Sequence, residues 1–191
     1  MKIEHRITAE TKFQTRAENE EPVIEGYFAV FNSEYHICNG LSESIAPGAF
    51  QNALQADIRA LINHDTTLVL GRTAAGTLEL KEDDHGLWGK IHINPNDSDA
   101  MNIYERVKRG DVSQCSFGFK ILDETVTHRE DGSAHWTINA VKVHEVSCVT
   151  FPAYEETAIH ARQKDYEAIQ SRKLDKWREA MQNKLKGAKT C

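Results

Sequence analysis

The 191-residue sequence lacks the features that mark several protein classes. Its four cysteines have no CxxC spacing and no paired framework, which excludes a small disulfide-stapled domain and predicts reduced thiols (Cys38, Cys115, Cys148 and Cys191). No run of 18 apolar residues occurs, so we expect no membrane-spanning helix and no membrane partner. The N-terminal segment 1–14 is polar and lacks the apolar stretch of a signal peptide, which predicts a cytoplasmic protein.

Motifs that hold a cofactor or a metal are also missing. The sequence contains no HExxH, no P-loop and no glycine-rich dinucleotide turn. We therefore expect no cofactor and no metal. A metal could be bound only by residues that lie far apart in the sequence. A metalloenzyme that uses His64, Cys115 and Cys148 is one alternative.

The body of the chain has no excess of basic residues. The formal net charge is −6, but residues 158–191 hold nine Lys or Arg against four Asp or Glu, which leaves 14 basic and 25 acidic residues in 1–157. Phosphate binding needs a basic surface, so the acidic body argues against nucleic acid as a ligand. The basic tail is either a solvated helix or a separate segment with a partner of its own.

What the sequence does contain is a series of short β-rich segments joined by turn residues. Apolar residues make up 40%, enough for a core, and the pattern predicts a mainly β fold, an antiparallel barrel or sandwich with flanking helices. The expected strands are 23–31, 57–64, 76–81, 86–94, 112–122 and 135–150, and the expected short helices are 46–55 and 96–110. From about residue 161 a charged helix is expected, with an apolar stripe of Leu174, Trp177, Met181 and Leu185. The predicted division is a β domain over 1–158 and a helical tail over 159–191.

One histidine stands out from the nine. His64 follows Ile58, Ala60 and Ile62 at period two, so we expect it on the same face as a buried row, at the end of a strand. A half-buried imidazole that still reaches solvent can act as a general base. The alternative interpretation is an ordinary core histidine.

Two further segments carry candidate polar groups. In 113–120, Ser116 and Gly118 share one strand face, where a small hydroxyl beside a glycine leaves room for a substrate backbone. In 143–153, His144 and Glu145 interrupt an apolar run, and regular alternation would point them to opposite faces. Each segment also has a plain interpretation, as an ordinary strand serine and an exposed strand glutamate.

Taken together and in order, these segments resemble the prohead proteases of tailed bacteriophages, the serine proteases of capsid maturation. The resemblance rests on EGYFAVFN (25–32), SESIAPGAF (42–50), LINHDTTLVLGR (61–72), YERVKRGDVSQCSFGF (104–119) and HEVSCVTFPAYEETA (144–158). The segments around INHD and HEVSCV are also similar to parts of the herpesvirus assemblin proteases. The fold that this resemblance implies is the closed antiparallel β-barrel of these maturation proteases.

The resemblance also implies roles for individual residues. In the family the histidine of the NHD motif is the general base and the serine before FGF is the nucleophile, which are His64 and Ser116 here. Assemblins have a second histidine as the third member of the triad. The phage pattern instead has an acid directly before Val-Ser, which favours Glu145 over His144.

The implied function is an endopeptidase that cuts the scaffolding protein, or the scaffolding region of the major capsid protein, inside the procapsid in the host cytoplasm, and also cuts itself. Assemblins act as dimers, so a homodimer is a possible state. By the same analogy a backbone N–H near residues 153–154 would serve as an oxyanion donor. A non-enzymatic β domain that binds capsid or scaffold remains an alternative.

Overall fold

A computed structural model describes residues 4–7, 13–18, 21–38 and 40–151, together with Ser171, Leu174, Asp175, Trp177, Arg178 and Met181. Strands dominate these residues, which confirms the prediction of a mainly β fold. The strands are β1 (Glu4–Ile7), β2 (Gln14–Glu18), β3 (Glu21–Val30), β4 (Tyr35–Cys38), β5 (Leu41–Ile45), β6 (Arg59–Ile62), β7 (Asp65–Arg72), β8 (Leu78–Glu82), β9 (Gly86–His92), β10 (Gln114–His128) and β11 (Ala134–Val149). The helices are a 3₁₀ turn at Thr73–Ala75 and α1 at Ser98–Arg109.

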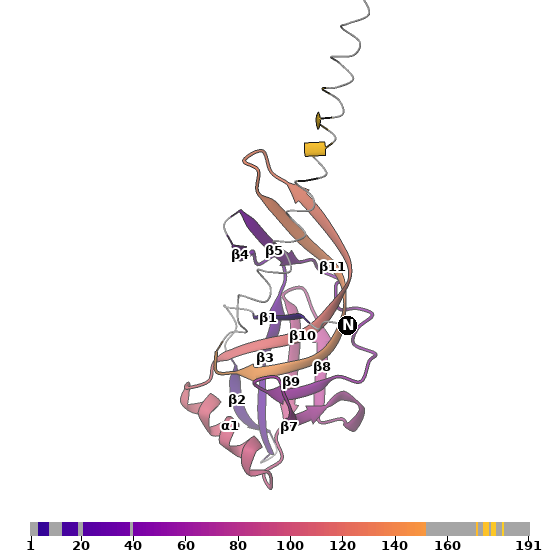
Figure 1. Cartoon of the computed structure of the whole chain (residues 1–191). Coiled ribbons are helices and arrows are strands. Elements are labelled where there is room, and N and C mark those ends of the chain that lie inside the picture. Colours follow the sequence, from indigo (N-terminus) through magenta and orange to yellow (C-terminus); the bar gives the residue numbers. More distant parts are fainter. Residues whose placement is uncertain are drawn as a thin grey trace, which may run out of the picture.

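The strands form two sheets, and Figure 1 shows α1 beside β2 of the smaller sheet. The seven-stranded sheet runs β1-β10-β11-β5-β4, with β6 paired to both β11 and β7, and the four-stranded sheet runs β2-β3-β9-β8. Among the described strands no ladder joins the ends of either sheet. The expected closed barrel is therefore not supported, and the sequence could not reveal this because closure depends on pairing between strands far apart in the chain.

The pairing is also not wholly antiparallel, contrary to expectation. β11 runs antiparallel to β10 but parallel to β5 and to β6. Parallel neighbours need a long connection between them, because a tight turn can only reverse the chain. β11 follows β5 and β6 by many residues, so this arrangement is possible here.

The two sheets share one apolar core. Phe28 of the smaller sheet and Phe117 and Phe119 of β10 are fully buried in the same cluster. The rings of Phe117 and Phe119 stack with centroids 4.6 Å apart. Each buried aromatic ring removes a large apolar area from water, so this cluster is a main source of the free energy of folding.

Local signals predicted some elements well and others poorly. Helix α1 begins after Asp97, whose carboxylate accepts from the amides of Asp99 and Ala100, and it ends at Gly110 with φ +90°. Both ends agree with the predicted helix over 96–110. The helix expected over 46–55 is wrong: this segment forms turns, and the Glu82 carboxylate accepts from the amides of Gly48 and Phe50 at 2.8 and 2.9 Å.

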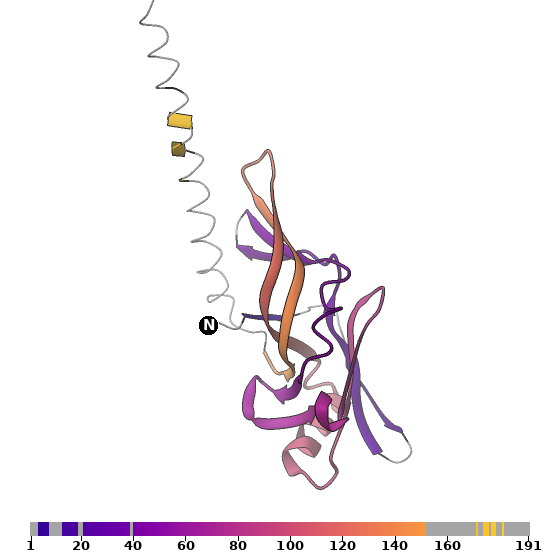
Figure 2. The ribbon, with the colours of Figure 1, turned by 90° about the vertical axis from the view of Figure 1, so that its right-hand side faces the viewer.

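The distal half of the β10–β11 hairpin extends away from α1, with β4 and β5 beside it (Figures 1 and 2). Ile37, Leu41, Ala134 and Trp136 form a second, smaller core there. Within the described part of the chain, no helix has the length and apolar character needed to cross a bilayer. The tail residues that are described are helical, and Leu174, Trp177 and Met181 of the predicted stripe are exposed. Leu185 lies outside the described residues.

Candidate active site

Ser116 lies near the start of β10, on the face opposite to the core. Cys115, Phe117 and Phe119 point into the core cluster, so the alternation of a strand directs Ser116 and Gly118 to the other face. Ser116 is nevertheless fully buried. The prediction that Ser116 and Gly118 share a face therefore agrees with the structure.

The residue opposite Ser116 on β11 is Ser147. Residues directly opposite in an antiparallel pair project to the same face, with Cβ atoms about 4.5–5.5 Å apart. Two residues earlier along β11, Glu145 lies opposite Gly118. Ser116, Ser147 and Glu145 therefore share one face, and Gly118 adds no side chain beside the carboxylate.

His64 comes from a turn and not from a strand, which corrects the predicted placement. Strand β6 ends at Ile62, and Ile62 pairs with Asp65, so Asn63 and His64 form a two-residue hairpin loop. Both have positive φ, +50° and +63°, as a type I′ turn requires. Asn and His are among the side chains that tolerate this region best. The strand alternation expected from Ile58 to His64 therefore ends at Ile62.

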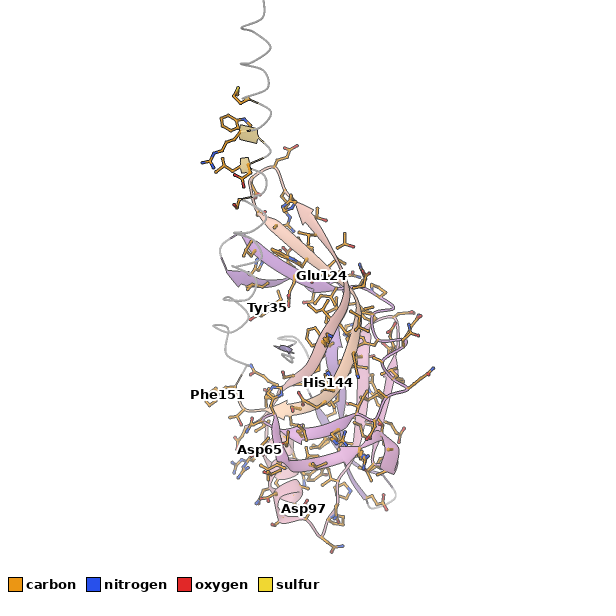
Figure 3. All side chains as sticks on the ribbon, turned by 45° about the vertical axis from the view of Figure 1, so that its right-hand side comes forward. Tyr35, Asp65, Asp97, Glu124, His144 and Phe151 are labelled. Carbon is orange, nitrogen blue, oxygen red and sulfur yellow. The ribbon has the colours of Figure 1, made fainter. Side chains whose placement is uncertain are left out.

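The turn is tied to the end of β11 by hydrogen bonds. The Asn63 amide donates to the Cys148 carbonyl at 2.9 Å, and the amide of Thr150 donates to Asn63 Oδ1 at 2.8 Å. The backbone N–H of His64 donates to Ser147 Oγ at 3.3 Å. These contacts hold His64 beside β11. Figure 3 labels Asp65, the residue after the turn, and Phe151, the residue after Thr150.

The His64 ring meets Glu145, with Nδ1 2.8 Å from Oε1. An ionised carboxylate only accepts hydrogen bonds, so the neutral ring carries its proton on Nδ1 and leaves Nε2 as the basic nitrogen. Ser147 Oγ donates to the other carboxylate oxygen, Oε2, at 2.5 Å. The side chains of His64 and Glu145 are only 20% and 10% exposed, so little water competes with their contact.

His144 does not take part in this contact. However, the expected regular alternation of His144 and Glu145 along the strand is not what separates them. Gly118 pairs with Glu145 and Phe119 with Val143, so His144 is the additional residue at a β-bulge. Val143 and Val146 both enter the core although they are three residues apart, so strict alternation does not hold between them. Burial and the nearby Lys142 lower the pKa of His144, and its Nε2 is buried with no hydrogen-bond partner among the described residues.

The scattered metal site that the sequence left open is not assembled. Cys115 and Cys148 lie directly opposite each other on β10 and β11 and both point into the core. Burial, with a smaller effect of Cys115, raises the pKa of the Cys148 thiol far above its usual range, which disfavours the thiolate that binds metal. Within the described ranges no group of three His, Cys, Asp or Glu side chains is placed to hold a metal ion. The suggested oxyanion donors near residues 153–154 lie outside the described residues.

The sequence did not identify the contacts made by Ser147 and Asn63. Both stand beside residues that were singled out, but their partners come from a different part of the chain. Ser147 contacts His64 across 83 residues, and Asn63 contacts Thr150 across 87. No local periodicity encodes such contacts.

Residues 8–172 match the model of the caudovirus prohead serine protease family. The chain is also 30% identical over 173 residues to the prohead protease of Enterobacteria phage HK97, covering 88% of this chain and 72% of that one. No solved structure matched the chain. The chain therefore belongs to the caudovirus prohead serine protease family.

Proposed function

We propose that this serine protease cleaves the scaffolding protein, or the scaffolding region of the major capsid protein, and itself, inside the procapsid, with Ser116 as nucleophile, His64 as general base and Glu145 as the acid that orients His64. The observation that carries the proposal is the 2.8 Å contact between His64 Nδ1 and Glu145 Oε1, beside the strand face that holds Ser116. Action in the prohead is supported by the family description and by the name of the HK97 relative, a prohead protease.

The proposed chemistry follows from these positions. Ser116 Oγ attacks the carbonyl carbon of the scissile bond while its proton passes to His64 Nε2. The imidazolium that forms is stabilised by Glu145, which accepts from Nδ1 throughout. His64 then returns the proton to the leaving amine, and water, activated by the same base, hydrolyses the acyl-enzyme.

The two alternatives from the sequence fare less well. A non-enzymatic capsid-binding domain has no need of a partly buried histidine and glutamate in hydrogen-bond contact beside a serine-bearing strand. Membership of a serine protease family also favours an enzyme. A metalloenzyme would require His64 and the two thiols together, whereas the thiols point into the core.

The function is tested by producing the chain together with the capsid and scaffolding proteins of the same phage. Intact-mass analysis should find shortened substrate and a shortened protease with the wild-type chain, and only full-length proteins with Ser116→Ala. Processing that continues with Ser116→Ala would show that another residue, or another protease, does the cutting.

Loss of the Ser147 hydroxyl should slow the reaction without weakening substrate binding. Ser147→Ala removes the donor to Glu145 Oε2 and the acceptor for the His64 amide, so the carboxylate is held less firmly. A hydrogen bond to a charged group contributes about 1.5–3 kcal/mol, so kcat should fall by roughly 10- to 100-fold with KM unchanged. The matched control, Ser147→Thr, keeps a hydroxyl and should retain most of kcat. Equal losses in both variants, or a change confined to KM, would contradict a positioning role.

A further inference from the structure

The N-terminal strand β1 lies on the outer edge of the strand that carries Ser116. It runs antiparallel to β10, with Ile7 opposite Ser116, Arg6 opposite Phe117 and His5 opposite Gly118. In the strand order β1 is the last strand of the larger sheet, and among the described strands it pairs only with β10 (Figure 1). The four residues of β1 therefore pair with the outer backbone edge of Ser116–Phe119.

The buried state of Ser116 shows that some part of the chain must move before a protein substrate can react. Ser116 has no exposed surface in this structure, although a nucleophile must meet the carbonyl carbon of the scissile bond. The opposite edge of β10 is paired with β11 from Gln114 to His128. Opening that long ladder would dismantle the sheet, whereas releasing the four residues of β1 would expose the edge next to Ser116 at little cost.

An exposed strand edge is a template for an extended peptide, which adds as a further strand through main-chain hydrogen bonds. We propose that the outer edge of β10 along Ser116–Phe119 is the binding edge for the extended substrate segment, and that β1 is a built-in cover that must leave first. This inference rests on the proposed role of Ser116. Because β1 is tethered, it competes at an effective concentration that a short linker can raise to about the millimolar range, so the cover should raise KM and leave kcat unchanged.

The test is a pair of substitutions in the full chain. The N–H groups of successive strand residues point to opposite sides, so His5→Pro combined with Arg6→Pro must remove one donor directed at β10. The control, His5→Ala combined with Arg6→Ala, keeps both backbone donors. We expect the proline pair to lower KM for an extended peptide, and to speed labelling of Ser116 by a small fluorophosphonate, by roughly fivefold or more, while the alanine pair behaves as wild type.

A free peptide of residues 1–10 gives a second result from the same variant. Added to the proline variant, MKIEHRITAE should inhibit competitively with substrate, whereas a scrambled peptide should not. Equal KM and labelling rates in all three proteins, or no competition by the peptide, would overturn the cover. Absence of Ser116 labelling in every variant would instead overturn the proposed function.

One measurement needs no substitution and so does not depend on how the proline variant folds. A peptidyl phosphonate that reacts with Ser116 of the wild-type chain should displace β1, so hydrogen exchange in a fragment covering residues 4–7 should accelerate. Unchanged exchange after complete labelling would show that substrate binds without moving β1.

Discussion

Replacing Ser116 with alanine should lower kcat by about 10⁶-fold, because the substitution removes the hydroxyl that forms the proposed acyl-enzyme. The substitution removes one oxygen atom from a buried position opposite Ser147. The fold should survive, and substrate should still bind. The measurement is turnover of a peptide substrate, with thermal unfolding to establish that the variant is folded.

Ser113→Ala is the matched control for this loss. Ser113 is exposed and precedes β10, so its hydroxyl is not part of the face that holds Ser147 and Glu145. Its substitution should change kcat little. A large loss in Ser113→Ala with an active Ser116→Ala would transfer the role of nucleophile to Ser113.

Glu145→Gln should lower kcat by roughly 10⁴-fold, the scale found when the acid of a triad is neutralised without a change of shape. The amide has nearly the volume of the carboxylate, so packing is retained. It removes the negative charge that stabilises the His64 imidazolium, and its NH₂ group can face Nδ1 and favour the wrong tautomer. The measurement is kcat for the folded variant under the conditions used for wild type.

His144→Gln is the control that separates the two adjacent candidates. Burial and Lys142 lower the pKa of His144, which favours its neutral ring, and an imidazole does not supply the negative charge that stabilises the His64 imidazolium. The contact with His64 is made by Glu145. His144→Gln should therefore be mild, and the reverse outcome for these two variants would give the third role to His144.

The sequence predicted the residues that meet at this site better than the backbone that brings them together. The NHD motif and the acid directly before Val-Ser pointed to His64 and Glu145, and the structure places these two side chains in contact. The alternation of side chains along a strand predicted their positions less well, because His64 lies in a turn with positive φ and His144 is the additional residue of a bulge. Turns and bulges interrupt the period of two on which such arguments depend.

For the fold as well, local sequence signals predicted elements but not the pairing of distant segments. The cap residues Asp97 and Gly110 act locally, and they predicted helix α1 correctly. The β8–β9 and β10–β11 turns fall in the gaps between the expected strands, between 76–81 and 86–94 and between 112–122 and 135–150, because turn residues act over a few positions. The parallel pairing of β11 with β5 and β6 joins segments far apart in the chain, and no nearby residue encodes it. The expected set also lacked strands β1, β2, β4, β5 and β7.

The central claim, that Ser116 is a nucleophile activated by His64, is tested most directly by a serine-reactive fluorophosphonate followed by digestion and mass mapping. One equivalent should attach to Ser116 in the wild-type chain, and labelling should be strongly slowed in Glu145→Gln and absent in Ser116→Ala. A label on Ser113 or on any other residue, or no label on a folded wild-type protein, would contradict the claim.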